Sequence, residues 1–161
     1  MHISGQGTLR VQLVRAAGLR AMDSNGFSDP YVKLTLAGHQ RKSKIVKKTL
    51  NPRWNETFDF EGELSQLIEQ PLDLQVWDSD GRFARSDPCG VATLDLSALR
   101  SGSHGPLEYE VLLDDGQQQK GRVYLTVTWF SMGGAALKCR CQPFCLRLKP
   151  ACRPHSPHLV T

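Results

Sequence analysis

The stretch Asp23-Ser-Asn-Gly-Phe-Ser-Asp29-Pro-Tyr-Val-Lys33 places two carboxylates in a turn-rich loop directly before an alternating apolar segment. A second stretch, Trp77-Asp78-Ser-Asp80-Gly-Arg-Phe-Ala-Arg-Ser-Asp87-Pro88, holds three more aspartates after another hydrophobic run. Carboxylates that lie close together raise one another's pKa or attract a cation, because like charges disfavour ionisation. The two stretches therefore predict the two halves of one cation site.

Calcium fits these donors better than other metals do. It accepts irregular sets of oxygen ligands, whereas magnesium requires a strict octahedron and soft metals prefer Cys or His, which both loops lack. An EF-hand is excluded, because twelve-residue loops starting at Asp23 or Asp78 would end at Leu34 or Cys89 instead of Glu. The alternative to ligation is a degenerate site whose aspartates only form turns and carry charge.

Alternating apolar and polar residues on both sides of the acidic loops predict β-strands. We expect eight of them, at residues 7–14, 31–36, 40–48, 54–60, 72–76, 89–96, 107–113 and 121–130, with one helical turn within 63–70. Short strands separated by turn signals are typical of a sandwich. We therefore predict an all-β, eight-stranded antiparallel β-sandwich with Trp54, Phe58 and Phe60 in its core.

The strand order along the chain also predicts where the acidic loops lie. If every strand crosses the sandwich once, each connection from an odd-numbered to an even-numbered strand lies at the same end. The loops at 23–29, 48–53 and 78–87 therefore share one rim, and the five aspartates of the two acidic stretches can meet there.

With these features the sequence resembles the C2 domain, the calcium- and lipid-binding β-sandwich of protein kinase C and synaptotagmin. The resemblance covers residues 6–130 and is carried by several motifs along the chain. These are Gly7-Thr-Leu-Arg-Val11, Ala17-Gly-Leu19, Asp23-x5-Asp29-Pro-Tyr-Val-Lys33, Thr49-Leu-Asn-Pro-x-Trp54-Asn-Glu-x-Phe58, Trp77-Asp-x-Asp80 and Asp87-x-x-Gly90. Because the Gly7 strand comes first and the Gly121 strand comes last, the resemblance implies the permuted type II topology.

The resemblance also implies a set of calcium ligands, namely aspartate carboxylates and two backbone carbonyls. The carboxylates are those of Asp23, Asp29, Asp78, Asp80 and Asp87, and the carbonyls are those of Met22 and Ser79. The span from Asp78 to Asp87 is one residue longer than the common pattern of the family. This leaves open whether Asp87 binds one ion or two, and whether Ser86 contributes.

Two groups of residues are expected to contact lipid. In the loops these are Phe27, Arg82, Phe83 and Arg85, and on a strand face the resemblance assigns Tyr31, Lys33, Lys42, Lys44 and Trp77. Bound Ca²⁺ would reverse the potential of the rim toward phosphatidylserine, and the basic face would meet phosphoinositides. The alternatives are that the basic run is a solvated or aggregation-blocking strand, and that the two phenylalanines pack back onto their loops.

The charge of the 161-residue chain is divided unevenly. Residues 1–130 hold 15 Lys and Arg against all 16 Asp and Glu, whereas residues 131–161 hold five basic residues and no acidic one. We expect one C2 domain at 1–130 and a Cys- and Pro-rich basic tail at 131–161 that is disordered. A nucleic-acid-binding domain would carry its basic excess on a folded face. For the tail, palmitoylation, zinc binding and an unusual splice or fragment end remain open.

The cysteine pattern bears on the compartment. An odd count of five, four of them in the tail, and the lack of a signal-peptide pattern indicate a reducing compartment, for which the cytoplasm is the simplest choice. No apolar run reaches the roughly 18 residues of a spanning helix, so membrane association should be peripheral.

The predicted function follows from the rim and the basic face together. We expect a monomeric, non-catalytic membrane-targeting module that binds anionic phospholipid when Ca²⁺ is present. One alternative is a calcium-independent phosphoinositide or protein-interaction module that uses the basic strand face. The other is an enzyme with paired carboxylates, which no accompanying nucleophile elbow, phosphate loop or His-based constellation supports.

Overall fold

The computed structural model describes residues 5–79, 86–101, 105–116 and 121–132. Within them lie eight strands, one short α-helix and one 3₁₀ helix. The strands are β1 (Gln6–Ala17), β2 (Pro30–Leu36), β3 (His39–Lys42), β4 (Arg53–Glu63), β5 (Leu72–Asp78), β6 (Asp87–Leu94), β7 (Leu107–Leu112) and β8 (Arg122–Ser131). The helix α1 (Leu64–Leu67) follows β4, and the 3₁₀ helix η1 (Ser97–Ser101) follows β6.

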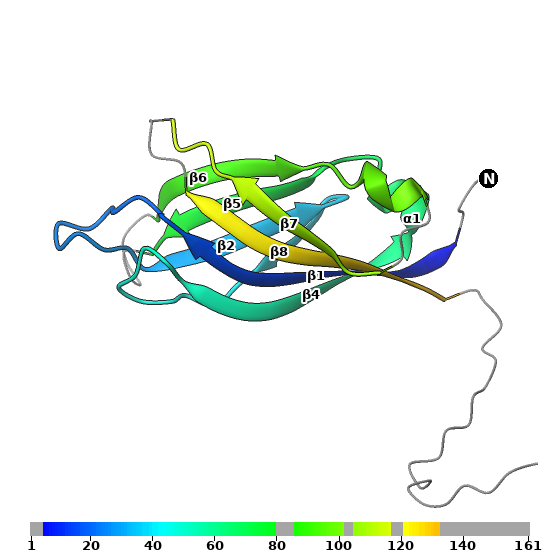
Figure 1. The fold of residues 1–161 in the computed structure, drawn as a ribbon, viewed down its shortest axis with the longest axis horizontal. Helices are drawn as coiled ribbons and strands as arrows, with labels where there is room; N and C mark the ends of the chain where they lie inside the picture. Colours follow the sequence, from blue (N-terminus) through cyan, green and yellow to red (C-terminus); the bar gives the residue numbers. More distant parts are fainter. Residues whose placement is uncertain (1–4, 80–85, 102–104, 117–120, 133–161) are drawn as a thin grey trace, which may run out of the picture.

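The strands form two antiparallel sheets of four strands each, packed face to face (Figure 1). Sheet I has the order β4-β1-β8-β7 and sheet II has the order β3-β2-β5-β6. The predicted eight-stranded antiparallel β-sandwich is thereby confirmed. The last strand, β8, pairs with the first strand along its whole length, as expected for the type II topology.

The core consists of the inward-facing residues of both sheets. Leu9, Val11 and Leu13 alternate along β1 at 0% exposure, and Val32, Leu34 and Leu36 do the same along β2. This alternation arises because successive side chains of a strand point to opposite faces. Trp54 and Phe60 are buried and Phe58 packs against the core, as predicted. Burial of each such side chain contributes about 1.5–3 kcal/mol.

Several strand boundaries differ from those predicted. β1 continues to Ala17 past an irregularity in register between Leu13 and Arg15, which an alternation pattern does not reveal. β3 ends at Lys42 instead of residue 48, because Ser43 turns inward and its hydroxyl accepts the N–H of Val32 at 2.9 Å. The strand predicted at 89–96 is β6, which begins two residues earlier and ends at Leu94, before η1 starts at Ser97.

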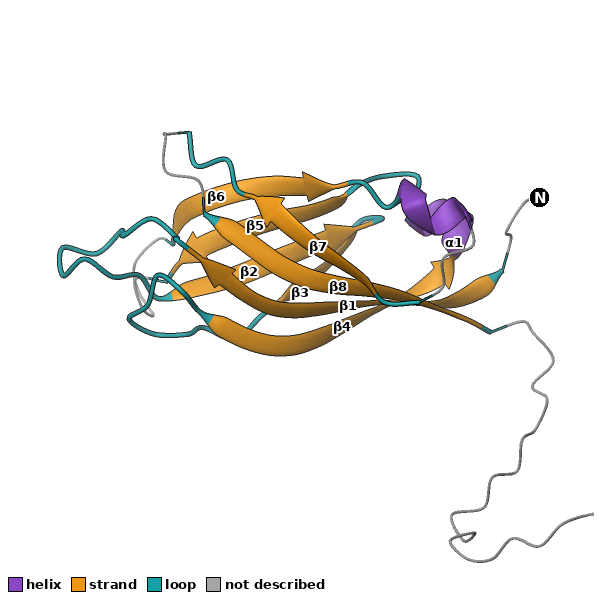
Figure 2. Cartoon of the chain, viewed as in Figure 1, coloured by secondary structure: helices purple, strands orange, loops and turns teal. Residues whose placement is uncertain are grey.

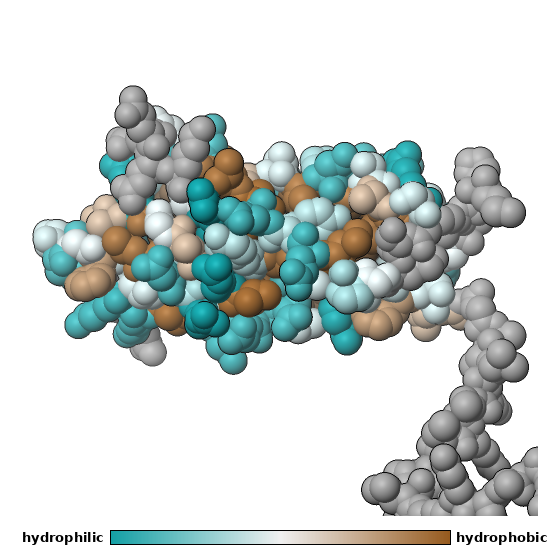
Figure 3. Space-filling model, viewed as in Figure 1, coloured by the Kyte–Doolittle hydropathy of each residue, from teal (hydrophilic) through white to brown (hydrophobic). Residues whose placement is uncertain are grey.

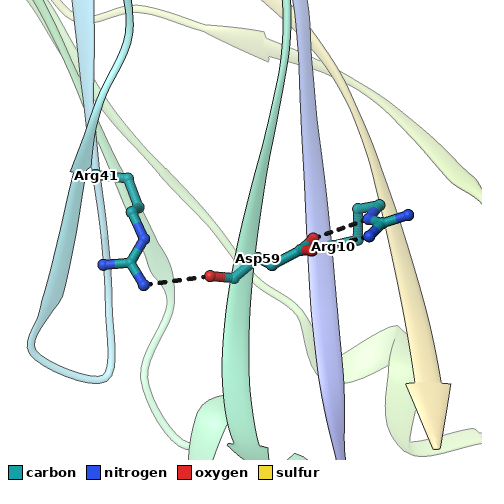
Figure 4. A network of polar contacts seen from close by, with 3 residues as sticks. All are labelled: Arg10, Arg41 and Asp59. Carbon is teal, nitrogen blue, oxygen red and sulfur yellow. Dashed lines mark hydrogen bonds and ion pairs between the residues drawn. The ribbon is translucent and has the colours of Figure 1, made fainter.

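Side chains bridge the two sheets along the edge where β3 approaches β4 (Figure 4). The guanidinium of Arg41 on β3 donates to the backbone carbonyl of Asp59 on β4 at 3.3 Å. The Asp59 carboxylate in turn accepts two N–H groups of Arg10, each at 2.8 Å. These hydrogen bonds hold the pKa of the Asp59 carboxyl below its ordinary value. Hydrogen bonds therefore connect β3 of sheet II to β4 and β1 of sheet I along this edge.

The acidic and basic loops gather at one end of the sandwich (Figure 2). The β1–β2 and β3–β4 connections lie there, and β5 ends and β6 begins at the same end, while α1 lies at the other. Backbone and side-chain bonds join the first two connections, since Leu19 N–H donates to Leu50 O at 3.0 Å and Gly18 N–H to Asn51 Oδ1 at 2.9 Å. The shared rim expected from strand parity is present.

Candidate functional site

The first acidic loop is a fixed turn built around Ser28. This serine is fully buried, and its hydroxyl accepts the N–H of Met22 at 3.0 Å while it donates to the carbonyl of Arg20 at 2.9 Å. Asp23 N–H and Met22 N–H both donate to the carbonyl of Phe27. These backbone hydrogen bonds fix Asp23 within the turn. Its side chain is half-buried, and the carboxylate is not used in these bonds.

Asp29 and Asp78 meet where β2 begins and β5 ends. The N–H of Asp29 donates to Asp78 Oδ1 at 2.5 Å, and Asp29 Oδ1 accepts the N–H of Lys48 from the neighbouring loop at 2.7 Å. The N–H of Ser79 donates to the Asp29 carbonyl at 3.2 Å. These bonds join three loops of the rim around two carboxylates.

Asp78 is the most constrained of the predicted ligands, with only 1% of its surface exposed. In the antiparallel ladders it lies opposite Pro30 on one side and opposite Asp87 on the other. Directly opposed residues have Cα atoms about 4.5–5.5 Å apart, so the strand ends bring Asp29, Asp78 and Asp87 to neighbouring positions. A buried carboxylate beside other carboxylates favours a compensating cation.

The remaining predicted ligands are placed only in part. Asp87 is exposed and Asp23 is half-buried on a separate turn. Asp80 lies outside the described residues, as do Arg82, Phe83 and Arg85. Among the residues that are described, no three His, Cys, Asp or Glu side chains converge closely enough to hold a metal. The predicted ligand set thus remains a prediction.

Four residues predicted to contact lipid lie together on the outer side of sheet II, and Tyr31 among them is only 3% exposed. Tyr31 and Trp77 lie opposite each other on β2 and β5, and Lys33 and Lys42 lie opposite each other on β2 and β3. The Lys33 ammonium lies 4.4 Å from the centroid of the Trp77 ring, and the Lys42 ammonium lies 4.0 Å from that of Tyr31. Directly opposed like charges are unfavourable, and the two rings offset that cost by cation–π attraction.

Other predicted contacts are arranged differently. Lys44 follows the end of β3, where its backbone N–H donates to Glu56 Oε1 at 2.8 Å and its carbonyl accepts from Trp54 Nε1. No ring contact joins Lys44 to the other residues of the face within the described chain. Phe27 is 46% exposed, so packing back onto its loop is not what the structure shows.

Ile45, which was not predicted as a site residue, is 42% exposed on the β3–β4 connection. It stands between Lys44 and Val46, whose backbone groups pair with neighbouring segments, and this pairing leaves the intervening side chain outside. The sequence signal that could have indicated its exposure is an isoleucine within the basic run at residues 41–48. It adds a second exposed apolar side chain to loops of the rim.

Among the residues that the structure describes, no helix is long and apolar enough to cross a membrane.

Comparison with known proteins places these features in a family. The sequence model of the C2 domain matches residues 7–111. Human multiple C2 and transmembrane domain-containing protein 1 is 45% identical over 113 residues, covering 69% of this chain and 11% of that protein. Human synaptotagmin-3 is 44% identical over 97 residues, covering 58% of this chain and 16% of that protein. The chain therefore spans only a small part of these relatives.

Solved structures agree with the sequence comparison. A single C2 domain of plant extended synaptotagmin 1 superposes with a TM-score of 0.68 at 25% identity, covering 81% of this chain and 98% of that one. The calcium-bound pair of C2 domains of extended synaptotagmin 2 gives a TM-score of 0.66 at 25% identity, covering 79% of this chain and 46% of that one. On the matched motifs and this architecture, the chain belongs to the C2 domain family.

Proposed function

We propose that this C2 domain binds anionic phospholipid membranes when Ca²⁺ binds at the rim, and that it acts as a membrane-targeting module without catalysis of its own. The observation that carries the proposal is the junction of Asp29 and Asp78, where a carboxylate at 1% exposure is fixed among three loops. The calcium-bound state of the related C2 domains of extended synaptotagmin 2 supports the assignment of Ca²⁺.

The donors available at the rim fit a hard cation. They are carboxylates and backbone carbonyls, with no thiol or imidazole in either acidic stretch. The proposed ligands are the carboxylates of Asp23, Asp29, Asp78, Asp80 and Asp87 and the carbonyls of Met22 and Ser79. When bound, Ca²⁺ would supply positive charge and open coordination positions for a lipid phosphate or carboxylate.

The protein's own residues would orient the docked domain. Phe27, together with Phe83, would enter the headgroup region as interfacial apolar side chains do, and Arg82 and Arg85 would meet phosphates there. Lys33 and Lys42, supported by Tyr31 and Trp77, would contact a phosphoinositide headgroup from the side. Each basic residue near an anionic surface contributes about 1 kcal/mol. Lys44 is included among the proposed lipid contacts because it adds a further positive charge near this surface.

Cosedimentation with phosphatidylserine vesicles across a calcium titration tests the proposal. The wild-type chain should bind with calcium and be released by chelator, whereas Asp78→Asn plus Asp80→Asn should not bind at any calcium concentration that saturates the wild type. A matched control, Glu61→Gln plus Glu69→Gln, removes the same charge from exposed positions away from the rim and from the outer face of sheet II, and it should bind normally. Binding that ignores calcium and the rim substitutions would overturn the proposal.

Because Asp78 is buried, its replacement could weaken the fold itself. Thermal unfolding separates the two effects: the wild-type melting temperature should rise with added Ca²⁺ in the absence of lipid, since a ligand that binds only the folded state stabilises it. Asp80→Asn alone should reduce that rise. A rise of equal size in both proteins would speak against the proposed ligand set.

A second candidate function rests on the outer face of sheet II. The lysines over Tyr31 and Trp77 form a concentrated positive surface that needs no metal. A calcium-independent phosphoinositide or protein-interaction module would use this face. Vesicle binding that persists in chelator and is lost on Lys33→Gln plus Lys42→Gln would favour it.

The remaining predictions concern the context of the domain. We propose that residues 1–130 form the C2 domain and that 131–161 form a separate tail, whose described part ends at Met132. We also propose that the domain is a monomer in the cytoplasm that reaches the membrane peripherally on calcium binding.

A further inference from the structure

The outer face of sheet I contains a groove that the proposed calcium and lipid sites do not use. This face is turned toward the viewer in Figure 3, where hydrophilic and hydrophobic residues are interspersed. The groove has a volume of about 470 Å³. It is lined by residues of β1, β7 and β8: Val14, Arg15, Glu108, Tyr109, Glu110, Tyr124, Leu125 and Thr126.

Arg15 is the distinctive residue of this groove. Its guanidinium carbon lies 3.6 Å from the centroid of the Tyr124 ring, close enough for the planar group to stack on the ring. The side chain is half-buried, yet in the described part of the chain it has no hydrogen bond or ion pair to a carboxylate. Arg10 and Arg122 on the same face differ, since they pair with Asp59 and Glu110.

A second arginine lies next to Arg15 on the adjacent strand. Arg53 on β4 is its direct cross-strand partner, and it is exposed without a carboxylate partner among the described residues. Like charges directly opposite each other destabilise a sheet. Stacked guanidinium groups are preorganised for bidentate recognition of a carboxylate or phosphate. Only Arg15 of the pair stacks on a ring and lines the groove, while Arg53 adds positive charge on the neighbouring strand β4.

The backbone departs from strict alternation at Arg15. Leu9, Val11 and Leu13 face the core, so strict alternation would turn Arg15 inward as well. The irregularity in register between Leu13 and Arg15 moves it to the outer face beside Tyr124, and Ala16 takes the buried position. Bulges commonly re-aim a side chain next to a functional site.

The opposite side of the groove is acidic. Glu108 and Glu110 on β7 are both exposed, and Glu110 already pairs with Arg122 at 3.2 Å. Strand β7 is separated from β1 by β8 alone. Two strand spacings amount to roughly 10 Å, and an extended peptide advances roughly 3.3 Å per residue. Side chains of an extended chain alternate between two faces, so an acidic residue and a basic one must be an even number of positions apart to reach the groove together. A spacing of four residues, roughly 13 Å, would allow flexible Glu and Lys side chains to reach both sides.

We propose that this groove docks an extended segment of mixed charge from a partner protein, with a carboxylate on Arg15, where Arg53 adds positive charge from the neighbouring strand, and a basic side chain near Glu108. A membrane surface fits less well, because the two glutamates repel anionic headgroups. The groove also lies on the sheet opposite to the lysine face. The domain thereby joins a protein partner through sheet I and a membrane through the rim and sheet II, and only the second of these contacts rests on the proposed function.

An NMR titration of the full chain tests this directly. The probe is the capped peptide Gly-Glu-Glu-Ser-Ser-Lys-Lys-Gly, added at low salt without calcium or vesicles. Amide shifts should concentrate around Arg15, Tyr124 and Glu110. In Arg15→Gln plus Arg53→Gln the affinity should fall about tenfold or more, as for loss of hydrogen bonds to charged groups. Arg100→Gln, an exposed arginine of η1, is the matched control and should bind normally.

Further titrations test whether the anionic group that binds the groove comes from a peptide, from free phosphate or from a lipid headgroup. A peptide with both Glu replaced by Gln should bind at least about tenfold more weakly, and inorganic phosphate and phosphatidylserine vesicles should shift the groove residues less than the peptide does. Equal binding of the Gln-substituted peptide, or groove shifts produced by vesicles and not by the peptide, would overturn the proposal. Arg15→Gln plus Arg53→Gln should retain calcium-dependent vesicle binding. The groove proposal can therefore fail while the proposed calcium-dependent function stands, and the reverse also holds.

Discussion

The outer faces of the two sheets both carry basic side chains over aromatic rings, but the charges of the neighbouring residues differ. On sheet II, Lys33 and Lys42 lie over Trp77 and Tyr31 and are each other's direct cross-strand partners. On sheet I, Arg15 lies over Tyr124 with carboxylates two strands away. A cation on an aromatic ring is thus not a signature of one ligand. The neighbouring charges decide whether an extended anionic surface or a segment of mixed charge is the better partner.

Among substitutions on the two outer faces, removing the sheet II cations should give the largest effect on membrane binding. Lys33→Gln plus Lys42→Gln should lower the affinity for vesicles that contain phosphoinositide about 30-fold, from about 1 kcal/mol for each lysine. Surface plasmon resonance on supported bilayers measures this loss. The matched substitution on the other face, Arg15→Gln plus Arg53→Gln, should leave it nearly unchanged. Equal losses in both would mean that the faces do not differ in partner.

Removing a supporting ring should give a smaller effect on the same face. Trp77→Leu keeps both lysines but removes the ring beneath Lys33, and a cation–π contact at such a site contributes about 0.5–1 kcal/mol. Vesicle affinity should therefore fall about two- to fivefold. Tyr124→Leu on sheet I should leave vesicle binding unchanged and weaken the mixed-charge peptide instead. The opposite assignment of the two substitutions would contradict the comparison.

Much of this arrangement could be predicted from the sequence, for identifiable reasons. The alternation at Leu9, Val11 and Leu13 has the period of a strand, and strand parity then places the loops at a common rim whatever the sheet order. The pairing of Tyr31 with Trp77 agrees with the face that the family resemblance implied. These features depend on local pattern and on chain order.

Other features depend on register and on single bonds, which no local pattern encodes. The end of β3 at Lys42 follows from the inward turn of Ser43, and the hydrogen bond between Asp29 and Asp78 follows from the pairing of β2 with β5. Arg15 would be assigned to the core by alternation, and only the irregularity beside it brings it to the groove. The full ligand set at the rim stays a prediction.

The smallest expected effect concerns a paired charge, Asp59, which contrasts with Arg15 and Arg53 of the same sheet. Because its folded-state pKa is lowered mainly by the hydrogen bonds from Arg10, its stabilising contribution is present above the ordinary carboxyl pKa and disappears as pH falls through the lowered value. Asp59→Asn should reduce the melting temperature at pH 7 by about 2 °C, the scale of an exposed ion pair.

The pH dependence makes this last prediction specific. The difference between wild type and Asp59→Asn should be constant from neutral pH down to about pH 4 and should shrink below it, as the wild-type carboxylate is protonated. Differential scanning calorimetry at matched ionic strength measures the difference, and Asp73→Asn serves as an exposed control without such a partner among the described residues. A difference that persists unchanged to about pH 2 would mean that Asp59 stabilises the edge through packing or its backbone contact with Arg41 instead of through its charge.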